Sequence, residues 1–172
     1  MALPTLTTVP VIITGASPLL CGKPADLPDG LTPVQQARER LYLGSDHQPV
    51  IPALNLARCL VGAGRLLNPP RSDLHQALDV NPSEIPIRSS VPWQVDTRTV
   101  RKPGTRERIN CHRPRFDSWS LAFEVHVDTE RIGLGVLMGL IELAGMRIGL
   151  GDYRVERGGP FGRFRLESWG PA

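Results

Sequence analysis

The segment WSLAFEVHV, residues 119–127, alternates between large apolar side chains and small or polar ones. Successive side chains of an extended strand point to opposite faces of a sheet. The odd-numbered positions therefore form an apolar face and the even-numbered positions a more polar one. Such a strand is typical of an antiparallel sheet with one face on the core and the other in solvent. We expect a sheet with one buried face and one solvent-exposed face. This expectation excludes an all-helical bundle.

The segment after this strand is almost wholly apolar and predicts a helix packed under the sheet. Asp128 and Thr129 would cap this helix, which would run to about Ile148. Each glycine inside it lowers helix stability by up to about 1 kcal/mol relative to alanine. Close backbone approach to a neighbouring element is the compensation expected at Gly133, Gly135, Gly139 and Gly145.

The other elements have weaker patterns, and the chain's 17 Gly and 17 Pro separate them. Residues 71–83 are ambiguous, with one or two helical turns expected over 73–78. The remaining expected elements are strands over 6–14, 85–100, 106–112 and 161–169, and helices over 34–42 (capped by Thr32) and 53–67. This order predicts an α+β fold, the ferredoxin-like (RRM-like) βαββαβ arrangement, in a single domain over 1–172. Insertions are expected at about 21–47 and 86–115, the second as a protruding basic β-hairpin.

Cysteine usage and hydropathy exclude several classes of protein. Cys21, Cys59 and Cys111 lie far apart with no CxxC pair, so neither a disulfide framework nor a structural zinc site is predicted. The longest uncharged apolar run, 132–141, is shorter than the roughly 20 residues of a membrane-spanning helix. No basic segment precedes an apolar one at the N-terminus, so no signal peptide is expected. We expect a cytoplasmic protein with no metal, cofactor or membrane partner.

The net charge of +3 conceals a local concentration of arginine. Between residues 88 and 115, eight basic residues stand against two acidic ones, a local charge of +6. A second basic cluster lies within 147–165. Two such clusters on a nearly neutral body indicate a polyanionic partner such as a nucleic acid.

The candidate nucleic-acid-binding residues fall into four groups. They are the hairpin and the segment after it (Arg98, Arg101, Lys102, Arg106, Arg113, Arg115), a polar stripe on the 53–67 helix (Asn55, Arg58, Arg65), the C-terminal Gly-rich loop (Arg147, Arg154, Arg157, Arg163), and Lys23. In the C-terminal loop, glycines are expected to let backbone N–H groups reach phosphates. Each group has an ordinary alternative: a solvated loop, a wet helix face, a helix end with a turn, or pairing of Arg113 or Arg115 with Asp117.

The sequence offers little support for an enzyme. It contains no Walker loop, Rossmann fingerprint, HExxH or nucleophile elbow. Cys111 and His112 are adjacent in an expected strand, so they would point to opposite faces and could not share one site. Asp26 and Asp29 are weak catalytic candidates, and their place around a Pro-Asp-Gly sequence favours a role in a turn.

Several motifs resemble the RAMP superfamily, above all the backbone subunits of CRISPR effector complexes. The segment PVIPALNLAR, 49–58, is similar to the family's I-P-G-S-S-L-K-G-A-L-R helix start, and TGASPLL, 14–20, to its first strand and turn. The sequences GLG, 149–151, and GGPFGR, 158–163, resemble the C-terminal Gly-rich loop of the superfamily. The basic hairpin resembles the thumb that such subunits lay across guide RNA. Short phage proteins also share this layout.

This resemblance implies a non-catalytic backbone subunit that binds single-stranded guide RNA in a CRISPR-like ribonucleoprotein. Its partners would be single-stranded RNA (or single-stranded DNA), copies of itself along the strand, and other effector subunits. One alternative is a phage-encoded protein that mimics such a subunit, as an anti-CRISPR or in phage nucleic-acid metabolism. Another is a RAMP endoribonuclease, because some backbone subunits cut target RNA with an acidic residue in the region of Asp26 and Asp29.

Overall fold

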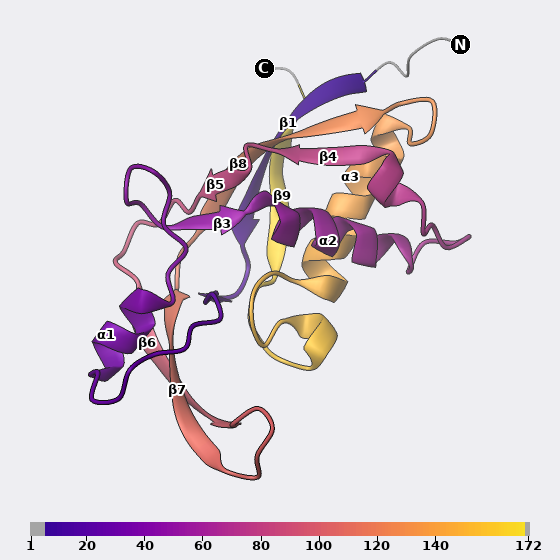
Figure 1. The fold of residues 1–172 in the computed structure, drawn as a ribbon. Helices are drawn as coiled ribbons and strands as arrows, with labels where there is room; N and C mark the ends of the chain where they lie inside the picture. The colour runs from indigo at the N-terminus through magenta and orange to yellow at the C-terminus, as the bar shows by residue number, and fades with distance from the viewer. Residues whose placement is uncertain (1–5, 171–172) are drawn as a thin grey trace.

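A four-stranded antiparallel sheet with two helices on one face forms the centre of the computed structural model, which describes residues 6–170 (Figure 1). The strand order is β4-β8-β1-β9. The elements of this core are β1 (Leu6–Gly15), α2 (Ala53–Gly64), β4 (Leu78–Asn81), β8 (Ser120–Asp128), α3 (Leu134–Leu143) and β9 (Phe164–Trp169). Taken in chain order they give βαββαβ, which confirms the expected ferredoxin-like α+β fold.

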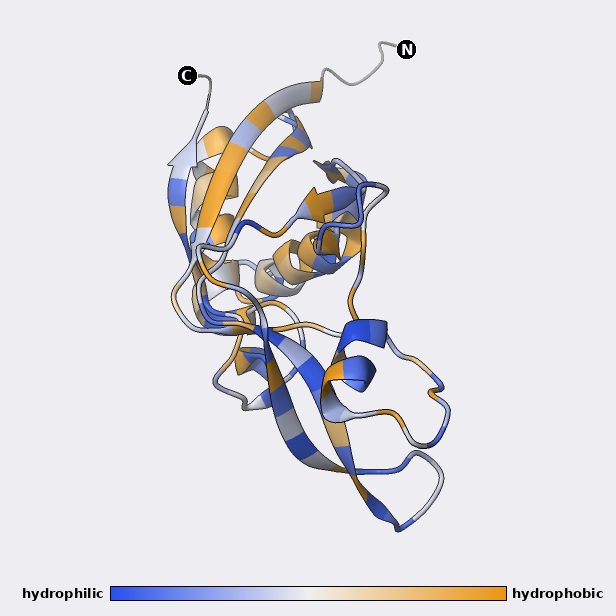
Figure 2. Ribbon diagram, turned by 90° about the vertical axis from the view of Figure 1, so that its left-hand side faces the viewer, coloured by the Kyte–Doolittle hydropathy of each residue, from blue (hydrophilic) through white to orange (hydrophobic). Residues whose placement is uncertain are grey.

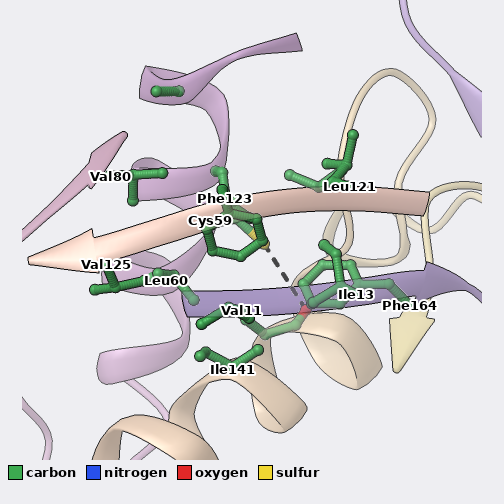
Figure 3. Close-up of a cluster of buried hydrophobic side chains, with 14 of the residues drawn as sticks. Val11, Ile13, Cys59, Leu60, Val80, Leu121, Phe123, Val125, Ile141 and Phe164 are labelled. Atoms are coloured by element: carbon green, nitrogen blue, oxygen red, sulfur yellow. Dashed lines mark hydrogen bonds between the residues drawn. The ribbon is translucent and has the colours of Figure 1, made fainter. Parts of the chain in front are cut away.

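The alternating segment forms β8, one of the two central strands. It pairs with β1 along its length, from Leu6 opposite Asp128 to Thr14 opposite Ser120. Its odd-numbered side chains are buried and Glu124 on the other face is exposed, as the alternation predicts. Figure 3 shows Phe123 of β8 among side chains from β1, α2 and α3, so this strand connects both helices to the sheet.

The second core strand lies in the segment 71–83, where the sequence predicted one or two helical turns and no strand. Residues 74–76 form a short 3-10 turn, η1 (Leu74–Gln76), and β4 follows at once. In β4 only Leu78 and Val80 face the core, which is too short an alternation to stand out in the sequence. Pairing with β8, including Val80 opposite Val125, holds this segment extended. Tertiary contacts thus decide its conformation.

Two insertions interrupt the core. The first contains β2 (Leu19–Leu20), α1 (Pro33–Glu39) and β3 (Val50–Pro52), and the second contains β5 (Glu84–Pro86), β6 (Gln94–Arg101) and β7 (Arg108–Phe116). Thr32 caps α1, as expected from the sequence, and Gln35 completes a reciprocal capping box, but the helix ends before Tyr42. The expected strand over 85–100 is divided into β5 and β6. Strands β6 and β7 form a hairpin that extends from the body and is largely hydrophilic (Figure 2).

The apolar helix differs from the prediction in its start and in its packing. It begins at Leu134, with Gly133 as N-cap, whereas Asp128 accepts a hydrogen bond from the backbone of Glu130 in a preceding turn. A Cβ added at Gly133, Gly135 or Gly139 would meet no atom within 4 Å, so these positions face open space and the expected close approach is wrong there. A π-helical turn, η2 (Ala144–Ile148), continues α3 and packs against β9. No helix in the described range is long and apolar enough to cross a membrane.

Close backbone approach does occur at Gly145, in η2. A Cβ at this position would overlap the carbonyl oxygen of Phe164 in β9. We therefore expect Gly145→Ala to lower the free energy of unfolding by roughly 1–3 kcal/mol, because the backbone must move apart. Gly139→Ala, in the open face of α3, should raise it by about 0.5–1 kcal/mol. Urea unfolding of the two variants measures both effects, and a neutral Gly145→Ala would contradict this packing.

Candidate nucleic-acid interface

The basic hairpin packs on the body of the protein through one face of its base. Its strands pair from Gln94 opposite Arg115 to Arg101 opposite Arg108. Side chains alternate across a strand, so Asp96 and Arg98 share one face with Arg113 and Cys111 of β7. Asp96 and Cys111 are buried, and the cation–π contacts of Arg98 and Arg113 place this face against the C-terminal Gly-rich loop. The hairpin therefore has a base that is packed on the body and a tip, residues 101–108, that is exposed.

Arg98 is held inside this contact. Its Nε lies 2.8 Å from Oδ1 of Asp96, and its NH2 lies 3.3 Å from Oδ2. Its guanidinium also lies 4.7 Å from the ring centre of Phe161 and 5.1 Å from that of Tyr153. A guanidinium with a bidentate carboxylate and two aromatic faces has most of its interactions satisfied within the protein. Arg98 therefore connects the hairpin to the loop.

Arg113 makes a second connection at the hairpin base. Its Nε lies 3.1 Å from Oδ2 of Asp152, and its guanidinium lies 5.6 Å from the ring centre of Tyr153. Burial raises the pKa of Asp152, and the positive charge of Arg113 opposes this rise. The backbone N–H of Asp152 also donates to the carbonyl of Leu20 at 2.6 Å. Asp152 thus joins the loop, β7 and β2.

Carboxylates lie near three more of the candidate cations. Arg115 is 2.8 Å from Asp117, an alternative that the sequence had left open, and Arg154 is 2.9 Å from Glu156. Lys102 is 3.8 Å from Glu107, with both side chains more than half exposed. An exposed pair such as Lys102–Glu107 contributes about 0–1 kcal/mol. These pairs reduce the positive charge that Arg115, Arg154 and Lys102 offer to a phosphate.

The remaining candidate cations are available to a ligand. Within residues 6–170, no carboxylate lies within 4.0 Å of Lys23, Arg58, Arg65, Arg101, Arg106, Arg147, Arg157 or Arg163. The same holds for Arg108 at the hairpin tip, which the candidate set had omitted. Lys23 is half-buried and the others are exposed. The set therefore includes both the hairpin tip and the body beside the hairpin.

A cleft of about 280 Å³ brings several candidate groups together. Asn55 and Arg58 of α2 line it, together with Gly151, Asp152, Arg154 and Glu156 of the Gly-rich loop. Gly22 and Pro24, on either side of Lys23, also line it, and Ile148 and Leu150 supply apolar surface. Arg65, two turns beyond Arg58 on α2, is not among the lining residues.

The glycines of the C-terminal loop serve packing within the protein, which corrects the expected phosphate cradle. The backbone N–H groups of Gly149, Gly158, Gly159 and Gly162 each donate to a carbonyl of the chain, at 2.8–3.1 Å. Gly162 has a φ of 74°, and a Cβ at Gly151 would overlap the carbonyl of Leu20. The loop needs glycine to fold back on residues 18–22. Phosphate binding here would depend on side chains.

The weak catalytic candidates lie in a surface loop. Asp26 and Asp29 are both exposed in the loop between β2 and α1. Among residues 6–170, no three His, Cys, Asp or Glu side chains are placed to hold a metal ion. Cys21 and Cys59 line the cleft, and burial raises the pKa of each thiol to about 12. Both thiols are neutral near pH 7 and are poor nucleophiles.

The reactivity of the three cysteine thiols tests whether they are buried as the structure shows. We expect the folded protein to react slowly with Ellman's reagent at pH 8, because Cys21, Cys59 and Cys111 are buried and the first two have pKa values near 12. The urea-unfolded chain should release the colour of three thiols at once. Rapid reaction of the folded protein at two or more thiols would show that these cysteines are not buried as described.

Comparison with known proteins supports the fold. No protein-family model matches the sequence, and no curated protein matches it. A chain in the cryo-EM structure of the Type III-B Cmr-beta bound to cognate target RNA superimposes with a TM-score of 0.65 and 14% sequence identity. The match covers 95% of this chain and 60% of that chain, so this protein spans less than two thirds of its neighbour's length. At this identity the likeness shows a shared fold.

Proposed function

We propose that this protein is a non-catalytic RAMP-type subunit that binds single-stranded RNA in a CRISPR-like ribonucleoprotein. The observation that carries the proposal is the set of unpaired arginines on the hairpin tip and beside the cleft. Arg58 and Asp152 both line the cleft, Asp152 pairs with Arg113, and β7 runs from Arg113 to the tip. At about 3.4 Å per residue, Arg108 at the tip is roughly 17 Å from Arg113. A basic path of this length suits an extended strand better than a compact anion.

The outer face of the main sheet is a poor alternative for the strand. RRM domains use this face, with exposed aromatic side chains that stack on bases. In this protein Phe123 of β8 points to the core, and Asp79, Glu124 and Glu167 are exposed on the outer face. Acidic residues repel phosphates, so the strand is assigned to the hairpin side.

The solved neighbour supports RNA as the ligand, because that assembly is bound to cognate target RNA. A strand longer than one binding site would hold several copies of this chain, together with other effector subunits. Asp26 and Asp29 are exposed in the loop between β2 and α1, where the Pro-Asp-Gly sequence favours a role in a turn, so the subunit is proposed to hold RNA without cutting it. Cleavage of labelled RNA that is lost in Asp26→Ala or Asp29→Ala would contradict this part of the proposal.

Salt dependence tests the role of the hairpin tip. For single strands, log K falls with log[salt] by about 0.7 for each neutralised phosphate. The triple variant Arg101→Gln, Arg106→Gln, Arg108→Gln should weaken RNA binding about tenfold and make this slope shallower by about 2. Filter binding at several salt concentrations measures both quantities.

The matched control removes arginine charge from elsewhere. Arg165 on the outer sheet face and Arg131 beside Asp128 are exposed or half-exposed and lie outside the proposed path. The double variant Arg131→Gln, Arg165→Gln should keep most of the affinity and slope. If both variants weaken binding equally, net charge alone explains binding. If the wild-type protein shows no salt-dependent binding, the proposed function is wrong.

A further inference from the structure

The cleft beside α2 contains polar side chains with no partner inside the protein. They belong to Asn55, Arg58 and Tyr42, three of the residues that line the cleft. None of them makes a side-chain hydrogen bond or an ion pair with another residue between 6 and 170. Tyr42 lies beside Asp152, and burial, Cys21 and Asp152 together raise its pKa, so its hydroxyl is protonated. These groups are free to bind a ligand.

Two acidic residues in the lining of the cleft make a phosphate an unsuitable occupant. Asp152 and Glu156 line the cleft, and each is already close to an arginine, Arg113 at 3.1 Å and Arg154 at 2.9 Å. A phosphate inside would lie near both carboxylates, in a site where only Arg58 adds unpaired positive charge. A neutral group that both donates and accepts hydrogen bonds meets no such repulsion.

The remaining lining favours a flat, partly apolar group. Pro24, Ile148 and Leu150 supply apolar surface to the cleft. The volume of about 280 Å³ is near the lower end of the range for small-ligand sites, about 300–1,000 Å³. A flat ring with hydrogen-bonding groups on its edge can contact both the apolar and the polar residues of this lining.

We propose that this cleft binds a nucleobase that carries an exocyclic amino group, with adenine as the best fit. The carboxamide of Asn55 can donate to and accept from the edge of adenine at the same time. The exocyclic amino group is a donor for the carboxylates of the lining, whereas uracil presents carbonyl oxygens there. Arg58, exposed at the rim, binds the phosphate that follows the base. This inference rests on the proposed function for the source of the base, a strand that runs along the arginines.

Mononucleotides test the cleft independently of strand binding. The probes are adenosine monophosphate, uridine monophosphate and ribose 5-phosphate, followed by ¹H–¹⁵N NMR titration of the full chain. Adenosine monophosphate should bind at least about tenfold more tightly than the other two and should shift the amide signals of Asn55, Gly151 and Asp152. Equal affinity for ribose 5-phosphate would show a phosphate site and overturn the proposal. Amide signals that shift only outside the cleft, or no binding of adenosine monophosphate, would also overturn the proposal.

Strands with one altered position test the cleft in its proposed setting. An oligouridylate of about 12 nucleotides lies within the site sizes of single-strand binders. The same strand is made with one central adenosine or one central abasic site. We expect the adenosine strand to bind at least about fivefold more tightly than the abasic strand. Equal binding of these two strands would overturn the base site while leaving the proposed function intact.

Variants of Asn55 test whether this residue causes the preference for adenosine. Asn55→Ala should remove the preference for adenosine and leave the salt slope unchanged, because no phosphate contact is lost. Asn55→Ser, which keeps a polar group of smaller reach, should behave in the same way. Arg165→Gln, on the outer sheet face, should keep the full preference. A preference that survives both Asn55 variants contradicts the assignment, whereas failure of every strand to bind contradicts the proposed function and leaves the mononucleotide result to decide the cleft.

Discussion

The contact between the hairpin base and the C-terminal loop organises the side of the molecule that we assign to RNA. The guanidinium of Arg98 lies over the rings of Tyr153 and Phe161 and pairs with buried Asp96. Cation–π contacts of this kind contribute about 0.5–2 kcal/mol each, and the paired carboxylate fixes their direction. The contact sets the hairpin at one angle to the body. Residues of the same loop and of α2 line the cleft.

The same contact divides the arginines into two classes. Those near the hairpin base have carboxylate or aromatic partners and shape the protein, as Arg98 and Arg113 show. Those at the tip and at the rim of the cleft, such as Arg106 and Arg58, lack such partners in the described residues and face solvent. A local charge of +6 in the sequence therefore overstates the charge that a strand would meet. The useful part is smaller and is confined to places where a polynucleotide has access.

The sequence predicted the elements that are determined by interactions between residues close together in the chain. The alternation in β8 and the N-cap at Thr32 have short-range causes, so the sequence alone predicted both. Strand β4 could not, because four residues carry too little pattern and pairing with β8 decides their conformation. The glycine loop was misread because glycine allows both an open anion nest and tight backbone packing. Only the position of Leu20 against Gly151 separates these two possibilities. The pairing of Arg113 with Asp152 joins distant segments, so spacing along the chain did not reveal it.

The central claim is that a single strand runs along the hairpin tip and the cleft, away from the outer face of the sheet. Photo-crosslinking of a 4-thiouridine-containing RNA strand, followed by mass spectrometry of the linked peptides, tests it most directly. The account predicts links to peptides from the hairpin tip, from α2 and from the Gly-rich loop. Links concentrated on the outer sheet face, around Glu124 and His126, would contradict it.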